Sequence, residues 1–162
     1  AIRYGNSATV EALLENPNVD PNFVGKQKVI PFLEAVKSGN RRMIDAFLIN
    51  SKTNFFVMDE DKSNAVHYAI LSGDAEILDL ILKIEGMDVK QKSDVFNSPL
   101  EMVLSIENVQ FASLLVKKIE DDLEKIPENE MTPNEIEQRN ICCAVSQLIE
   151  VYNSMNSSDS FM

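Results

Sequence analysis

The clearest pattern in the chain is a block of apolar and polar positions that recurs every 34 residues. Gly5, Gly39 and Gly73 lie 34 positions apart, and each is preceded by a four-residue segment that begins with Ala and a β-branched apolar residue. Glu107 occupies the fourth place in this series. Apolar pairs follow at a constant distance in every copy, at 13–14, 47–48, 81–82 and 115–116. Self-similarity at a fixed period is the sequence signature of a repeat protein.

Each copy predicts two short antiparallel helices. In the second copy, Phe32, Ala35 and Val36 fall on one face of a helix over 31–38, and Gly39 follows where a left-handed C-cap is needed. A second helix then begins, with apolar residues at the i, i+1, i+4 and i+5 positions that make a stripe. Asn or Asp precedes this helix in every copy and can accept hydrogen bonds from its first turn. These predicted N-caps are Asn6, Asn40, Asp74 and Asn108.

The first helices of the copies are capped less uniformly. Asn64 can cap its helix, and Ser98 can form a capping box with Glu101 around a proline at the first helical position. Ile30 has no side chain that can cap, which costs about 1 kcal/mol relative to Ser or Thr. Glu107 stands where glycine would, and a left-handed conformation there costs about 1–2 kcal/mol unless the turn differs.

These segments resemble the ankyrin repeat family. The family pattern T-P-L-H-x-A-A-x-x-G-H is approximated at 30–40, 64–74 and 98–108. The linker 54–63 resembles the Asp-rich hairpin finger between the units of that family. The resemblance covers residues 1–116 and implies about three and a half repeats, the first one truncated. The implied fold is an all-α, ankyrin-type helix-turn-helix solenoid with short hairpin fingers and a C-terminal capping helix.

Beyond residue 116 the pattern departs from the repeat. Apolar residues continue at helical spacing to Ile126, so we expect an extended helix that ends before Pro127, followed by a helix from Pro133 to about Tyr152. A stack of repeats leaves an apolar face open at each end, and we expect residues 117–152 to form a helical extension and cap over it. The Ser- and Asn-rich stretch 153–162 is predicted to be a disordered tail. The side chains of the cap expected to face the last repeat are Ile141, Ala144, Val145, Leu148 and Tyr152.

Charge and composition narrow the class of partner. The chain of 162 residues has a net charge of −11, with +1 on residues 1–50 and −12 on residues 51–162. Because Lys and Arg are needed to neutralise phosphate, we expect no binding to nucleic acid or anionic membranes, but to a basic or neutral protein. No stretch is apolar enough to predict direct membrane insertion. The adjacent Cys142 and Cys143 cannot supply a spaced disulfide framework, which favours a reducing, cytoplasmic or nuclear compartment.

The candidate chemical groups favour structural roles, so we expect no catalytic, cofactor or metal site. His67 is the only histidine, and the resemblance implies a structural hydrogen bond within the turn. Residues 59–64 begin like a calcium loop, but the Gly and Glu that such a loop needs are replaced by Asn64 and Ile70. Two adjacent cysteines on a helix point about 100° apart and cannot chelate one metal from that helix alone. The acidic stretch 120–137 is interpreted as solvated surface, and binding of a basic peptide is the alternative.

In the ankyrin family, the finger tips and the solvent-facing side of the inner helices carry most partner contacts. Several positions that correspond by phase are apolar or amphipathic here, and an exposed apolar patch usually marks a binding surface. The alternative is that Tyr68 and Met102 pack between neighbouring repeats and that the other positions are scattered. The candidate partner-binding residues are Tyr4, Val24, Met58, Tyr68, Leu71, Met102 and Ile106.

The sequence therefore predicts a monomeric, non-catalytic protein–protein interaction module that binds a partner protein through this concave inner-helix and finger surface. Position 1 falls in the middle of a repeat, so we expect the sequence to be part of a longer protein. The alternative hypothesis is a targeting or regulatory domain of a larger enzyme or effector, whose catalytic part lies outside this chain. That these 162 residues are themselves an enzyme is disfavoured, because the only histidine already has a structural role.

Overall fold

The chain is all-α, as the sequence predicts. The computed structural model describes residues 6–25 and 28–158, with side chains up to Met155, and these residues form eight α-helices and no strand. They fall into two compact units, residues 1–102 (unit 1) and 103–162 (unit 2), each of which is described by itself.

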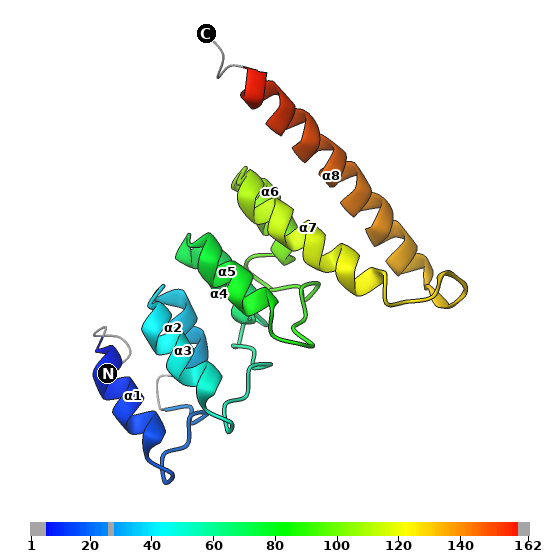
Figure 1. Cartoon of the computed structure of the whole chain (residues 1–162). Coiled ribbons are helices and arrows are strands. Elements are labelled where there is room, and N and C mark those ends of the chain that lie inside the picture. Colours follow the sequence, from blue (N-terminus) through cyan, green and yellow to red (C-terminus); the bar gives the residue numbers. More distant parts are fainter. Residues whose placement is uncertain (1–5, 26–27, 159–162) are drawn as a thin grey trace. The chain divides into compact units, whose positions relative to one another are not determined.

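Unit 1 is built from successive pairs of short helices joined by tight turns (Figure 1). α2 packs against α4, and α1 packs against α3. The first helices of the pairs therefore form an inner row, and α1 and α3 lie in an outer row. The helices are α1 (Ser7–Glu15), α2 (Pro31–Lys37), α3 (Arg41–Ile49), α4 (Ala65–Ser72) and α5 (Ala75–Leu82), and α6 (Pro99–Ser105) begins the next pair.

The predicted helix caps are confirmed. In α3, the side-chain oxygen of Asn40 accepts a hydrogen bond from the Met43 N–H at 3.2 Å. At α6, the Ser98 N–H donates to the Glu101 carboxylate at 3.0 Å and the Glu101 N–H to the Ser98 hydroxyl at 3.3 Å, which completes the predicted capping box. Ile30 makes no side-chain cap at α2. The remaining second helices are capped by Asn6, Asp74 and Asn108.

The turns within the helix pairs use the left-handed backbone conformation. Gly39 has φ 68° and Gly73 has φ 74°, values that glycine adopts without steric cost. Glu107 has φ 53°, so the left-handed residue predicted there is present and keeps its steric penalty. The sequence did not indicate three further left-handed residues in the fingers, Lys28 (φ 56°), Lys62 (φ 60°) and Asn97 (φ 61°).

The core of unit 1 lies between the helices of neighbouring pairs. Phe32 on α2 makes edge-to-face contacts with Phe47, at 6.0 Å between ring centroids, and with Phe55, at 5.2 Å. Burying a side chain of this size stabilises the fold by about 1.5–3 kcal/mol. Other core residues are Val36, Met43, Ile44, Ala65, Val66, Ala69, Ile77, Leu78 and Ile81.

Hydrogen bonds join each finger to the next. The side-chain oxygen of Asn22 accepts from the Asn54 N–H at 2.7 Å, 32 residues along the chain. One repeat later, the Asp94 N–H donates to the Asp61 carbonyl oxygen at 2.8 Å. Because polar backbone groups of one finger are satisfied by its neighbour, the finger conformation depends on stacking of the repeats.

Unit 2 contains an extended helix and a long C-terminal helix. α7 (Val109–Leu123) continues past the repeat length, as predicted, and α8 (Pro133–Ser158) packs against it (Figure 1). A short 3₁₀ turn, Glu128–Glu130, lies in the connection. The Thr132 hydroxyl and the Glu135 carboxylate form a capping box at the start of α8, at 3.3 and 2.8 Å from the N–H groups they cap.

The predicted buried face of α8 is largely wrong. Val145 is buried at 8% exposure, but Ile141, Leu148 and Tyr152 are 45%, 69% and 52% exposed, and Ala144 is exposed. The buried position in their place is Cys142. Both faces of α8 carry apolar residues at helical spacing, so hydropathy alone could not select the face that packs.

The predicted disordered tail is wrong for its first six residues. α8 continues through Ser158, and 159–162 lie outside the described residues. Between Asn153 and Ser158 there is no Gly or Pro to end the helix, and the low hydropathy of this stretch was a poor guide to its backbone. In the part of the chain that the structure describes, no helix is both long and apolar enough to cross a membrane.

Candidate protein-binding surface

The inner helices of unit 1 expose the same helical positions in successive repeats. On α2 these include Glu34 and Lys37, and 34 residues later on α4 they are Tyr68 and Leu71. The residues between them are buried, which fixes the orientation of this face. Leu71 is 43% exposed, so an apolar side chain stands where the repeat geometry requires a solvent-facing one.

Tyr68 links the inner-helix face to the second finger. Its hydroxyl donates a hydrogen bond to Asp59 Oδ2 at 2.5 Å, and Lys37 Nζ lies 5.7 Å from the ring centroid. Burial, together with the Asp59 carboxylate, raises the pKa of Tyr68 well above its ordinary value of 10.0. The ring is therefore neutral, half-buried and fixed in orientation, with one edge available on the surface.

Asp59 organises the finger below Tyr68. Its Oδ1 accepts hydrogen bonds from the N–H groups of Asp61 and Ser63, at 2.9 and 2.8 Å. The carboxylate is thus engaged by backbone and by Tyr68, which is the hairpin-tip role predicted for this segment. In the described residues, no group of three or more His, Cys, Asp or Glu side chains is placed to hold a metal ion.

His67 has the structural role implied by the sequence. Nδ1 lies 2.9 Å from the Asn64 side-chain oxygen and 3.3 Å from the Asn64 backbone nitrogen, and Nε2 lies 3.0 Å from the Asn97 carbonyl oxygen in the next finger. A carbonyl only accepts, so Nε2 carries a proton. Burial lowers the pKa of His67 below its ordinary value of 6.5 despite its bond to Asn97, which favours the neutral ring at pH 7. Both ring nitrogens are occupied, so the imidazole is not available for proton transfer to a ligand.

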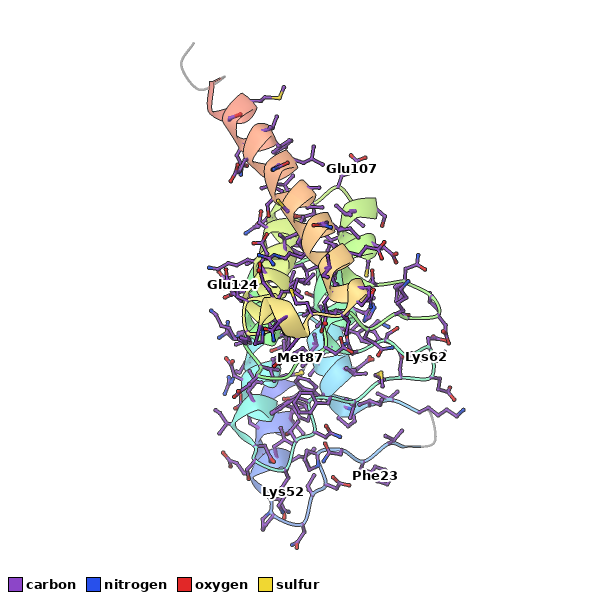
Figure 2. The ribbon with its side chains drawn as sticks, turned by 90° about the vertical axis from the view of Figure 1, so that its right-hand side faces the viewer. Phe23, Lys52, Lys62, Met87, Glu107 and Glu124 are labelled. Carbon is purple, nitrogen blue, oxygen red and sulfur yellow. The ribbon has the colours of Figure 1, made fainter. Side chains whose placement is uncertain are left out.

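The fingers add exposed apolar side chains to this face. Val24 is 47% exposed and Met58 is 49% exposed, as expected for finger residues. Phe23 and Val95, at 67% and 58%, were missed by the sequence analysis. Figure 2 shows Phe23 and Lys62 on finger loops that extend beyond the helices of unit 1. A phenylalanine directly beside Val24 was the signal that could have identified the first of them.

The three remaining predicted binding residues do not lie on this face among the described residues of unit 1. Met102 is 8% exposed, so the expectation that it lies on the surface is wrong. It occupies the phase of the half-buried Tyr68, and its flexible, unbranched side chain can pack where a rigid ring stays partly outside. Ile106 is 49% exposed and belongs to unit 2. Tyr4 lies outside the described residues.

Charged pairs connect the finger tips. Lys62 Nζ lies 2.8 Å from Asp94 Oδ1, and Lys28 forms the corresponding pair with Glu60 one repeat earlier. All four side chains are more than half exposed, so each pair contributes no more than about 1 kcal/mol. These ion pairs orient the finger tips more than they stabilise the fold.

The acidic stretch of unit 2 is partly neutralised. Lys118 and Lys125 donate to the same Asp122 oxygen at 3.2 and 2.9 Å. Burial pushes the pKa of Asp122 upward, but the two lysines outweigh it and the pKa is lowered. Lys118 lies just before the acidic stretch 120–137, and Lys125 lies within it. Asp122 is therefore a structural anion rather than a free acceptor for a basic peptide.

The fold and this surface define a helical repeat protein whose inner row of helices exposes apolar side chains. A family model of ankyrin repeats, with three copies, matches residues 1–93, more than half of the chain. The protein belongs to the ankyrin repeat family, whose repeats are generally protein–protein interaction modules. A search of curated proteins found no match to the chain.

Proposed function

We propose that unit 1 binds a segment of a partner protein across its inner-helix and finger face. This face, called the binding surface below, consists of Val24, Met58, Tyr68 and Leu71. The observation that carries the proposal is the exposure of Val24, Met58 and Leu71, each between 43% and 49%. Single exposed apolar residues are normal on proteins. These three residues, however, occupy repeat positions that face the same side of unit 1.

Tyr68 is the central anchor of the proposed surface. Its ring is already fixed by Asp59 and Lys37, so little side-chain entropy remains to be lost when a partner covers it. Tyrosine is also among the residues most often found at energetic hot spots of interfaces. Leu71 lies one helical turn further along α4 and supplies apolar area next to it.

The proposed partner segment is basic or neutral and carries apolar side chains. The second finger presents Asp59, Glu60 and Asp61 in succession, and the chain as a whole has a net charge of −11. Approach of an acidic segment would be opposed by this field, whereas a basic one would be steered toward the fingers.

The proposed activity is binding without catalysis, in a reducing compartment. The only histidine has both ring nitrogens occupied within the fold, which supports a structural role. Cys142 and Cys143 are both present as thiols, and neither forms a disulfide. Thiols persist in cytoplasmic and nuclear surroundings, which supports the proposed compartment.

The proposal is tested by the double variant Met58→Glu/Leu71→Glu. We expect the affinity for a partner isolated from the native cell by cross-linking to fall at least tenfold, because two buried charges replace apolar contacts. The unfolding temperature should stay within about 2 °C of the unmodified protein, since both side chains are exposed. Ile49→Glu is the matched control, because Ile49 is 84% exposed on the outer helix α3. Equal affinity of the double variant and the control would show that the partner binds elsewhere.

A further inference from the structure

The helix α8 carries apolar residues on two faces. Between Ile141 and Met155, ten of fifteen residues are apolar and only Glu150 is charged, although 25% of the whole chain is charged. One face, with Cys142 and Val145, is buried as α8 packs on α7. A helix that is apolar on both sides is expected to be covered on both.

The second apolar face of α8 is open. Its residues follow the i, i+3, i+4, i+7 spacing of a single stripe. Their exposed fractions are between 52% and 69%, and depletion of charge around such a patch is the compositional mark of an interface core. The α8 stripe consists of Leu148, Val151, Tyr152 and Met155.

A groove runs beside the α8 stripe within unit 2. It has a volume of about 380 Å³ and is bounded by Leu148 and Tyr152 on α8 and by Leu104 and Val109 at the end of α6 and the start of α7. Leu104 is itself 46% exposed. We call these four residues the cap groove. Its open form and its continuity with the stripe suit an elongated occupant, because a small molecule in the groove would leave Val151 and Met155 uncovered.

The lining of the cap groove includes one charged side chain, that of Glu107. Glu107 forms no ion pair with another residue that the structure describes. No Lys or Arg occurs in 103–116 or in 140–158. The 140–158 segment of a second copy would therefore bring no cation to Glu107, whereas a cationic segment of a partner would be attracted to it.

We infer that the cap groove and the α8 stripe form a second protein-interaction surface, whose occupant is an amphipathic helix of a partner protein. That helix inserts apolar residues spaced i, i+3, i+4 and i+7 against Leu148 and Tyr152, and it carries Lys or Arg beside them to meet Glu107. The surface is made by unit 2 alone and does not depend on the binding surface of unit 1.

The test is selection from a display library of 16-residue amphipathic peptides, with apolar residues fixed at i, i+3, i+4 and i+7 and the other positions randomised. The target is the full chain of 162 residues. We expect the enriched peptides to carry Lys or Arg flanking the apolar positions. Labelled copies of these peptides should bind in a fluorescence anisotropy titration, and Leu148→Glu should weaken them at least tenfold. Leu148 is 69% exposed, so this substitution leaves the helix intact, which circular dichroism checks.

Three further variants separate the groove from other surfaces. Glu107→Lys should weaken the same peptides about tenfold and restore affinity for versions in which their basic residues are replaced by Glu. Ile49→Glu and Met58→Glu/Leu71→Glu should leave peptide binding unchanged, so failure of the unit 1 proposal would be seen separately. Enrichment of acidic peptides, no enrichment, or binding that is insensitive to Leu148→Glu would overturn the inference. So would self-association of the chain that Leu148→Glu abolishes, because the stripe would then be covered by a second copy.

Discussion

At the scale of single residues, the buried His67 is a group through which pH acts on this fold in mild acid. Nδ1 of its ring contacts Asn64, and Nε2 is bonded to Asn97 in the next finger. Protonation would place a charge in a site without solvent. Because the bond to Asn97 joins one repeat to the next, the protonation state of one side chain is coupled to the stacking of unit 1.

The coupling predicts a loss of stability in mild acid. Burial lowers the pKa of His67 from its ordinary value of 6.5, so the unfolded chain binds a proton at a pH where the folded chain does not. The contribution is fully present above pH 6.5 and is lost as the pH falls below it, with a slope of at most about 1.4 kcal/mol per pH unit. Chemical denaturation between pH 7.5 and 5.5 measures this slope.

His67→Gln provides the control for that measurement, since it keeps a polar side chain at the cap but does not titrate. We expect the variant to be less stable at pH 7.5 and to show a smaller change between pH 7.5 and 5.5. The lowered pKa values of Glu101 and Asp122 act further into acid, below their ordinary values of 4.5 and 3.8. Parallel pH profiles for the two proteins would contradict the assignment of a buried, neutral imidazole.

At the scale of the helix pair, one turn differs from the others in its chemistry. Gly39 and Gly73 reach positive φ values without cost, but Glu107 holds φ 53° with a side chain attached. Among the three occurrences of this turn that the structure describes, only the last is therefore strained.

This difference predicts that substitutions at equivalent positions change the free energy of unfolding in opposite directions. Glu107→Gly should raise the free energy of unfolding by about 0.5–1 kcal/mol, and Gly73→Ala should lower it by about 1 kcal/mol. A Cβ on Gly73 would meet no atom within 4 Å, so its cost is conformational and not steric crowding. Urea titration of each variant gives the values, with Glu107→Gln as the control for loss of charge. Stabilisation by Gln equal to that by Gly would contradict the backbone argument.

The helix caps and turns could be predicted from the sequence because they depend on near neighbours along the chain. Asn40, Ser98 and Glu107 each act on groups within a few residues of themselves. The packed face of α8 and the burial of Met102 depend on contacts with distant residues and were predicted incorrectly. The two faces of α8 have similar hydropathy in the sequence, and only the packing of α8 on α7 distinguishes them.

The candidate binding surface was predicted in part. Repeat phase located Val24, Met58 and Leu71 at exposed positions, because a fixed period transfers orientation from one copy to the next. It did not predict that Tyr68 is fixed by Asp59 and Lys37, since those contacts link a helix, a finger and a neighbouring repeat. Exposure follows from periodicity, whereas the rigidity of an anchor follows from three-dimensional contacts.

At the scale of the whole molecule, the described chain combines a repeat unit with a helical unit of different surface character. Unit 1 presents rigid finger tips joined by backbone hydrogen bonds, such as that from Asp94 to Asp61. Unit 2 presents an apolar stripe beside a groove that Glu107 lines. The two proposed surfaces would suit a protein that brings two partner segments together, and the variants above are designed to remove each surface without the other.

The central claim, that a partner lies across the inner-helix and finger face of unit 1, is tested most directly by hydrogen–deuterium exchange of the chain with and without its isolated partner. The account predicts slower exchange, on binding, in peptides that cover 55–63 and 66–73, with unchanged exchange in the outer helix α3. Protection confined to α3, or absent from the fingers and α4, would contradict it.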